Sequence, residues 1–164
     1  MKVRIAASIV LAALVVTGTS ACTLLAPAAT LTQYDSSDGV NATVADLKVR
    51  NAIVLNARDG SVGSLLVSLV NGSDTDMHVT IQYADADGNR VDKMAMLAPG
   101  QSAEFGSAGH DQILLENIDA QPGSLLPVFF TYGSETGVEL LVPVLDGTLS
   151  QYSDLVPSSA PQER

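Results

Sequence analysis

Residues Met77–Ala84, with the sequence Met-His-Val-Thr-Ile-Gln-Tyr-Ala, alternate between side chains suited to a core and side chains suited to water. Val79, Ile81 and Tyr83 share one side of an extended chain, because successive side chains of a strand point to opposite faces. This alternation is typical of a strand with one buried face. The segment Asp85–Asn89 follows as a turn, since its Asp-Gly pair supplies the positive φ angles of a tight hairpin.

The same period of two extends outward from this segment through the middle of the chain, interrupted by turn residues. The expected strands are 48–56, 64–70, 77–84, 90–97, 102–106, 112–116, 125–132 and 138–144. Tight turns favour antiparallel pairing, and no segment of ten or more residues has a helical apolar face. Pro127 and Pro143 indicate edge positions, because proline donates no ladder hydrogen bond. We therefore predict an all-β fold, an antiparallel β-sandwich of seven or eight strands.

Composition narrows the class of protein further. The chain has 164 residues, of which 46% are hydrophobic, with 18 acidic and 8 basic side chains and a net charge of −10. This length suits one small domain with tails. A single cysteine excludes a disulfide scaffold and a cysteine-cluster metal site. The acidic balance argues against nucleic acid as a partner, because binding to phosphate needs clustered Lys and Arg.

The N-terminal region has the organisation of an export signal. Lys2 and Arg4 precede an uninterrupted apolar run over residues 5–16, and small residues follow up to Cys22. The run is about half the roughly 20 residues that a membrane-spanning helix needs. We expect residues 1–21 to form a signal-peptide helix, cleaved between Ala21 and Cys22.

The residues Ser20-Ala21-Cys22 resemble the lipobox of bacterial lipoproteins, in which two small residues precede the modified cysteine. The resemblance implies lipidation at Cys22 and a protein held on the extracytoplasmic face of the cell membrane by its lipid anchor, since two acyl chains anchor firmly. The alternative is a general signal peptidase, which would cut the same bond and leave a plain secreted protein.

The remaining chain divides into three expected parts. Residues 22–33 are small, uncharged and proline-interrupted, which predicts a tether. The β-sandwich domain is expected over 34–152, and a disordered tail over 153–164. Within the domain, the run from Asn71 through Asp76, the 77–84 strand, the Asp-Gly turn and 97–105 resembles bacterial immunoglobulin-like domains. The whole chain also resembles small actinobacterial lipoproteins, a group whose role is unknown.

Soft metal ligands form the first candidate site. Thioether and imidazole groups suit copper, and such groups occur at Met77, His78, Met94, Met96 and His110. Met94 and Met96 would point to the same face of a strand. The alternative is that these methionines pack as ordinary hydrophobes. The Asp85–Asn89 segment does not match a calcium loop, because its glycine stands at position 4 rather than 6.

Catalytic signals are weak. His78 and His110 are the only histidines, and neither lies near a Gly-x-Ser-x-Gly nucleophile motif. Gly60–Ser64 lacks the lysine of a phosphate loop, and no dinucleotide motif follows a strand, so no nucleotide is expected. In the expected strand 125–132, alternation places Phe130 and Tyr132 on one face and Phe129 on the other. The face with Phe129 is either covered by another part of the chain or an exposed interaction patch.

Together these features predict an exported, lipid-anchored lipoprotein of the cell envelope that is not an enzyme. Its role would be that of a binding or assembly module, with the membrane and an envelope protein as its expected partners. We assign no catalytic, cofactor-binding or metal-ligating residue from sequence. Copper binding through the Met and His residues is the alternative function, and a hydrolase using His78 or His110 is the third.

Overall fold

A computed structural model describes residues 4–6, 8, 37–56 and 61–157. The chain divides into two compact units, residues 1–34 and residues 35–164. In the first unit, the described residues 4–6 and 8 are helical. Ala21, Cys22 and the predicted tether lie outside the described residues. None of the helical residues described forms a segment long and apolar enough to cross a membrane.

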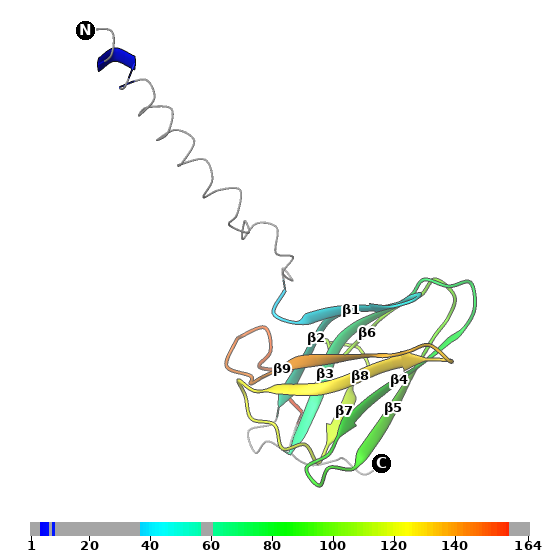
Figure 1. The fold of residues 1–164 in the computed structure, drawn as a ribbon. Coiled ribbons are helices and arrows are strands. Elements are labelled where there is room, and N and C mark those ends of the chain that lie inside the picture. Colours follow the sequence, from blue (N-terminus) through cyan, green and yellow to red (C-terminus); the bar gives the residue numbers. More distant parts are fainter. Residues whose placement is uncertain (1–3, 7, 9–36, 57–60, 158–164) are drawn as a thin grey trace, which may run out of the picture. The chain divides into compact units, whose positions relative to one another are not determined.

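The second unit consists of strands and turns (Figure 1), which confirms the predicted all-β fold. Within the described part of this unit there are nine strands. They are β1 (Val40–Val44), β2 (Leu47–Asn56), β3 (Val62–Asn71), β4 (Met77–Ala84), β5 (Arg90–Leu97), β6 (Ser102–Phe105), β7 (Ile113–Glu116), β8 (Leu125–Tyr132) and β9 (Val138–Leu145). The expected count of seven or eight is too low by the N-terminal strand β1, a short run of five residues in which Val40, Ala42 and Val44 alternate with Asn41 and Thr43.

The strands form one curled path in the order β5-β4-β8-β9-β2-β3-β6, and β1 pairs with β2 while β7 pairs with β3. The path folds over into two facing halves (Figure 1), with β5, β4, β8 and β9 in one and β2, β3, β6 and β7 in the other. The chain crosses between the halves after β3, β5 and β7. Greek-key connections of this kind are typical of β-sandwiches.

One strand pair departs from the expected antiparallel arrangement. β9 pairs antiparallel with β8 and then continues alongside β2 in parallel, with Val144 opposite Val54 and Leu145 opposite Leu55. Strands far apart in sequence can pair in parallel because no tight hairpin has to join them. The pairing closes one side of the sandwich, so β5 and β6 are the two ends of the strand path.

The predicted edge character of the two prolines is only local. Pro127 and Pro143 lie in β8 and β9, which are interior strands of the path. β4 pairs with β8 only from Val128 onward, and β2 pairs with β9 only at Val144 and Leu145. Each proline therefore has a paired strand on one side only. On the other side no neighbouring strand needs the N–H group that proline lacks.

The core lies between the two halves of the sandwich. The inward residues of β4, Met77, Val79, Ile81 and Tyr83, are all buried there, as their alternation predicts. A second cluster, formed by Ile53, Leu55, Leu66 and Tyr152, lies under the C-terminal segment. Leu155 and Val156, which belong to the predicted tail, pack against that second cluster. The Tyr152 hydroxyl donates a hydrogen bond to Asp38 at 2.8 Å.

Asn71 joins the end of β3 to two neighbouring loops. Its side chain is fully buried, and its amide donates to the carbonyl oxygens of Thr75 at 2.7 Å and Ala98 at 3.0 Å. Its side-chain oxygen accepts hydrogen bonds from the backbone N–H and the hydroxyl of Ser73. Buried polar groups are stable only when paired in this way. Asn71 therefore holds together the β3–β4 and β5–β6 connections.

Replacing Asn71 with Ala should destabilise the fold by about 1–3 kcal/mol, because several backbone groups lose their buried partner. Urea unfolding followed by circular dichroism measures this change. Gln112→Ala, at an exposed position just before β7, is the matched control and should change stability by less than about 0.5 kcal/mol. Equal stability of the two variants would contradict the role of Asn71.

Candidate functional site

The candidate site is the solvent side of the strands β5, β4, β8 and β9, which we call the outer face. Strand pairing arranges its side chains in rows that cross the strands. One row joins Met96 to His78, and the next joins Met94 to Thr80 and Thr131. A third row contains Asp92, Gln82, Phe129 and Glu139, and beyond it lie Arg90 with Ala84 and Pro127 with Leu141. The outer face thus changes from soft donors at one end to apolar residues at the other.

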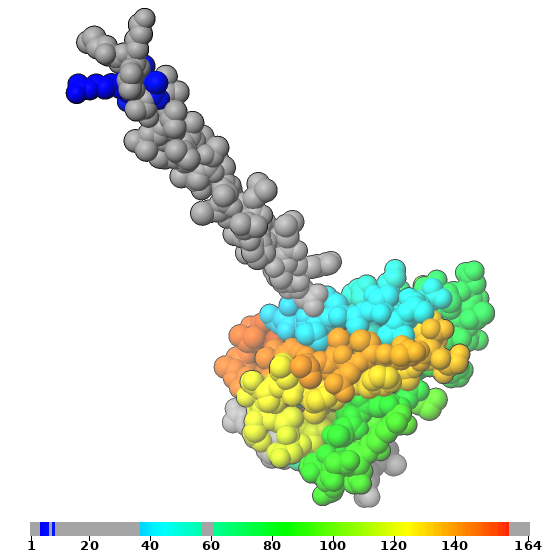
Figure 2. Space-filling view, viewed as in Figure 1, coloured from blue at the N-terminus to red at the C-terminus, as the bar shows by residue number. Residues whose placement is uncertain are grey.

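Large apolar side chains are concentrated on this face. Met94 is 70% exposed, Met96 66%, Leu125 57% and Leu141 52%. Among the described residues of the second unit, Leu149 is the one other large hydrophobic residue that is exposed. Figure 2 shows the strands that carry this face as adjoining orange, yellow and green bands. Single exposed apolar residues are ordinary, but several on one face indicate an interaction surface.

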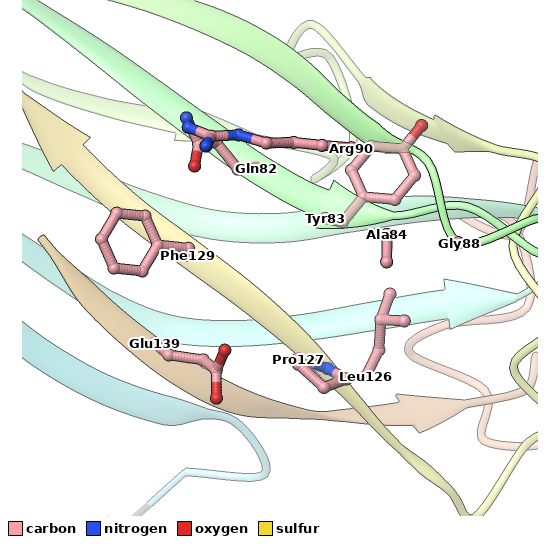
Figure 3. Close-up of a pocket in the computed structure, with 9 residues that line it drawn as sticks. All are labelled: Gln82, Tyr83, Ala84, Gly88, Arg90, Leu126, Pro127, Phe129 and Glu139. Atoms are coloured by element: carbon pink, nitrogen blue, oxygen red, sulfur yellow. The ribbon is translucent and has the colours of Figure 1, made fainter.

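A groove of about 210 Å³ lies at the apolar end of the outer face. Its floor and walls combine Phe129, Pro127 and Leu126 with the charged residues Arg90 and Glu139 (Figure 3). The exposed Arg90 also lies 3.4 Å from Asp92, a solvated ion pair that contributes little to stability. Apolar surface beside opposite charges is the composition of a small recognition site.

The face of Phe129 is partly covered by its own hairpin. Phe130 is fully buried and Tyr132 packs against the main core, whereas Phe129 is half-buried on the outer face. The Phe129 ring lies directly over Gly137, where an added Cβ would meet ring carbon Cε1 at 2.5 Å. The outward side of β8 was expected to be either covered or an exposed interaction patch. Most of the Phe129 ring is covered, and the rest of its surface lines the groove.

Three of the five soft donors come together on the outer face. His78 lies directly opposite Met96 on the neighbouring strand, and Met94 is two residues before Met96 on the same side. The His78 side chain is exposed and makes no hydrogen bond to another described residue. Met77 does not belong to this group, because it points into the core and is only 2% exposed. A single ligand set containing all five residues is therefore wrong.

His110 lies apart from His78, on the turn after β6. Its Nδ1 is 2.9 Å from the Ser107 hydroxyl, which donates to Glu104 at 3.3 Å. A hydrolytic triad needs the carboxylate on the histidine, whereas here it contacts the serine. His110 and Met96 do line one open hollow between β5 and β6. Glu104 and His110 are exposed and Ser107 is half-buried, so the three groups form no enclosed site for a hydrolase.

The Asp85–Asn89 segment is a turn that uses its own carboxylate. Asp85 accepts hydrogen bonds from the backbone N–H groups of Asp87 and Asn89, and Gly88 has a φ of 81°. Slight desolvation works to raise the pKa of Asp85, but these hydrogen bonds outweigh it and lower that pKa. Among the residues that the structure describes, no three His, Cys, Asp or Glu gather to hold a metal ion.

Two contacts tie the candidate site to the opposite half of the sandwich. The Tyr83 hydroxyl donates to the Glu116 carbonyl at 3.2 Å and accepts from the Glu116 N–H at 2.9 Å. Burial is the main cause that raises the pKa of Tyr83. Lys93 reaches Glu116 at 2.9 Å. Both contacts join β4 and β5 to β7, so the outer face is supported from beneath.

A scan against protein-family models and a search of curated protein sequences both found no match for the chain.

Sequence reasoning missed the groove and the exposed leucines. Leu125 and Leu141 occupy outward positions of strands whose other outward residues include Glu139 and Thr131. The sequence did contain a signal for these two leucines, because they stand at the strand positions that alternate with the buried ones. The combination of Arg90 with Glu139 was not foreseeable, because it depends on which four strands adjoin.

Replacing Gly137 with Ala should destabilise the protein by about 1–3 kcal/mol, the usual cost of overpacking. The new methyl would lie 2.5 Å from the Phe130 carbonyl oxygen, a backbone atom that cannot swing aside. Urea unfolding measures the loss, and Ser134→Ala in the same loop should leave stability within about 0.5 kcal/mol. A Gly137→Ala protein as stable as that control would contradict the close packing of β8 over Gly137.

Proposed function

We propose that the chain is an exported lipoprotein of the cell envelope, anchored by lipid at Cys22, whose sandwich is a non-catalytic binding module. The observation that carries the anchor is the position of the chain's only cysteine, directly after a charged and apolar leader. Cleavage between Ala21 and Cys22 places that cysteine at the mature N-terminus. A lipid on this residue holds the folded domain at the extracytoplasmic side of the membrane.

The outer face supports the binding role. It carries four of the exposed large apolar residues, Met94, Met96, Leu125 and Leu141, together with the groove at Phe129. The full chain has a net charge of −10, and this acidic balance disfavours nucleic acid as a partner. An envelope protein is the partner class that fits a mixed apolar and charged surface.

Lipidation is tested by growing cells with a clickable palmitate analogue. The unaltered protein should be labelled, and Cys22→Ala should lose the label because no other thiol exists in the chain. Leu141→Ser, which changes only the outer face, is the control and should be labelled normally. An unlabelled parent protein, or label retained by Cys22→Ala, would refute the anchor.

The binding face is tested by a photo-crosslinking amino acid placed at Leu141. Leu149 is the matched control position, since it is similarly exposed (48% against 52%) but is not part of the outer face. We expect a discrete protein adduct in cells from position 141 and none from position 149. The same adduct pattern from both positions, or none from position 141, would contradict a binding role for this face.

A further inference from the structure

The geometry points to a binding site for a soft monovalent cation, Cu(I) or its analogue Ag(I), formed by His78, Met94 and Met96 at the soft end of the outer face. The site is independent of the lipid anchor. It differs from the wider set of five donors by leaving out Met77 and His110. The evidence is the strand register, the exposure of the three side chains and the chemistry of their donor atoms.

The register brings the three donors within reach of one ion. His78 and Met96 are directly opposed across β4 and β5, and such residues have Cβ atoms about 4.5–5.5 Å apart. Met94 is diagonal to His78, at about 7–8 Å by the same geometry. Methionine is unbranched and has three rotatable bonds, so both thioethers can turn toward an ion beside the imidazole.

The donor set selects the class of ion. Two thioethers and one imidazole are soft or borderline ligands, which suit Cu(I) and not the oxygen-seeking Mg²⁺ or Ca²⁺. The described residues hold no group of three His, Cys, Asp or Glu, so a zinc or calcium site of the usual kind is not available there. The acidic chain, with a net charge of −10, attracts cations in general.

Two observations distinguish His78, Met94 and Met96 from a packed hydrophobic patch: the exposure of their side chains and the small number of Met and His residues in the chain. Met94 and Met96 are 70% and 66% exposed, so neither contributes much to the core. The chain has only four methionines and two histidines, and three of these six residues meet at one end of one sheet face. Thr80 and Thr131 occupy the adjoining row, so no large side chain stands next to the donors there.

The hollow between β5 and β6 offers a different placement for the same ion. It is lined by Met96 and His110, which would pair one thioether with the other histidine. His110 contacts Ser107 through Nδ1, which leaves Nε2 as the one ring nitrogen that could bind the ion there. The His78 imidazole has no hydrogen-bond partner among the described residues, so either of its two ring nitrogens can be the one that presents a lone pair to the metal. The histidine variants below distinguish these two placements.

The test is competition for Cu(I) against a colorimetric chelator, under anaerobic conditions. The full chain is used in detergent with Cys22→Ser, which removes the only thiol. We expect this protein to withdraw one Cu(I) per chain. His78→Gln, Met94→Leu and Met96→Leu should each weaken binding more than about tenfold, since even an outer-shell partner of a metal is worth about 10- to 100-fold.

His110→Ala is the matched control and should bind Cu(I) as the parent does. Circular dichroism of each of the four variants checks that the protein is folded. Failure of the folded parent to withdraw Cu(I) would overturn the site. So would undiminished binding by His78→Gln, or a loss confined to His110→Ala, which would place the ion in the hollow between β5 and β6.

Discussion

The register between β4 and β5 is the constraint on which the outer face depends. All eight residues of β4 are paired with β5, from Met77 with Leu97 to Ala84 with Arg90. A shift of one residue would turn every side chain of β4 to the opposite face. Val79, Ile81 and Tyr83 would then be exposed and His78 buried, at the cost of most of the buried apolar surface of that strand. The core thus decides which side chains face the solvent.

Contacts beneath the sheet reinforce the same register. The Tyr83 hydroxyl makes two hydrogen bonds with the backbone of Glu116, and Lys93 contacts the carboxylate of the same residue. Both reach β7 from the β4–β5 pair, across the side of the sandwich where the strand path is open. With β9 bound to β8 on one side and to β2 on the other, the two halves are joined at opposite margins. A binding face supported at both margins is well suited to present fixed positions to a ligand.

Much of this arrangement follows from local pattern. The bounds of β4, β5 and β8 are those predicted from alternation and turn residues, because each strand has one buried face and ends at a Gly, Pro or Asp turn. β1 was missed although Val40, Ala42 and Val44 contribute to the core, because its alternation covers only five residues and has a small alanine at its centre. The parallel β2–β9 pair was missed because a pairing of strands about ninety positions apart leaves no local signal.

The candidate site shows the same division between local and non-local information. Alternation already assigned Met94 and Met96 to one face, and it separates Met77 from His78 as neighbours in a strand must be separated. The histidine opposite Met96 is His78 and not His110. This depends on the register of the β4–β5 hairpin and on the path of the β6–β7 loop. The groove depends on four strands and could only be found from their packing.

The most direct test is a nuclear magnetic resonance spectrum of the Cys22→Ser chain with ¹³C-labelled methionine methyl groups, titrated with Ag(I). The account predicts that the methyl signals of Met94 and Met96 shift together and stop changing at one equivalent. The signal of Met77, buried on the opposite face of β4, should stay in place. Equal movement of Met77, or no movement of the two exposed methyl groups, would contradict the arrangement of the outer face described above.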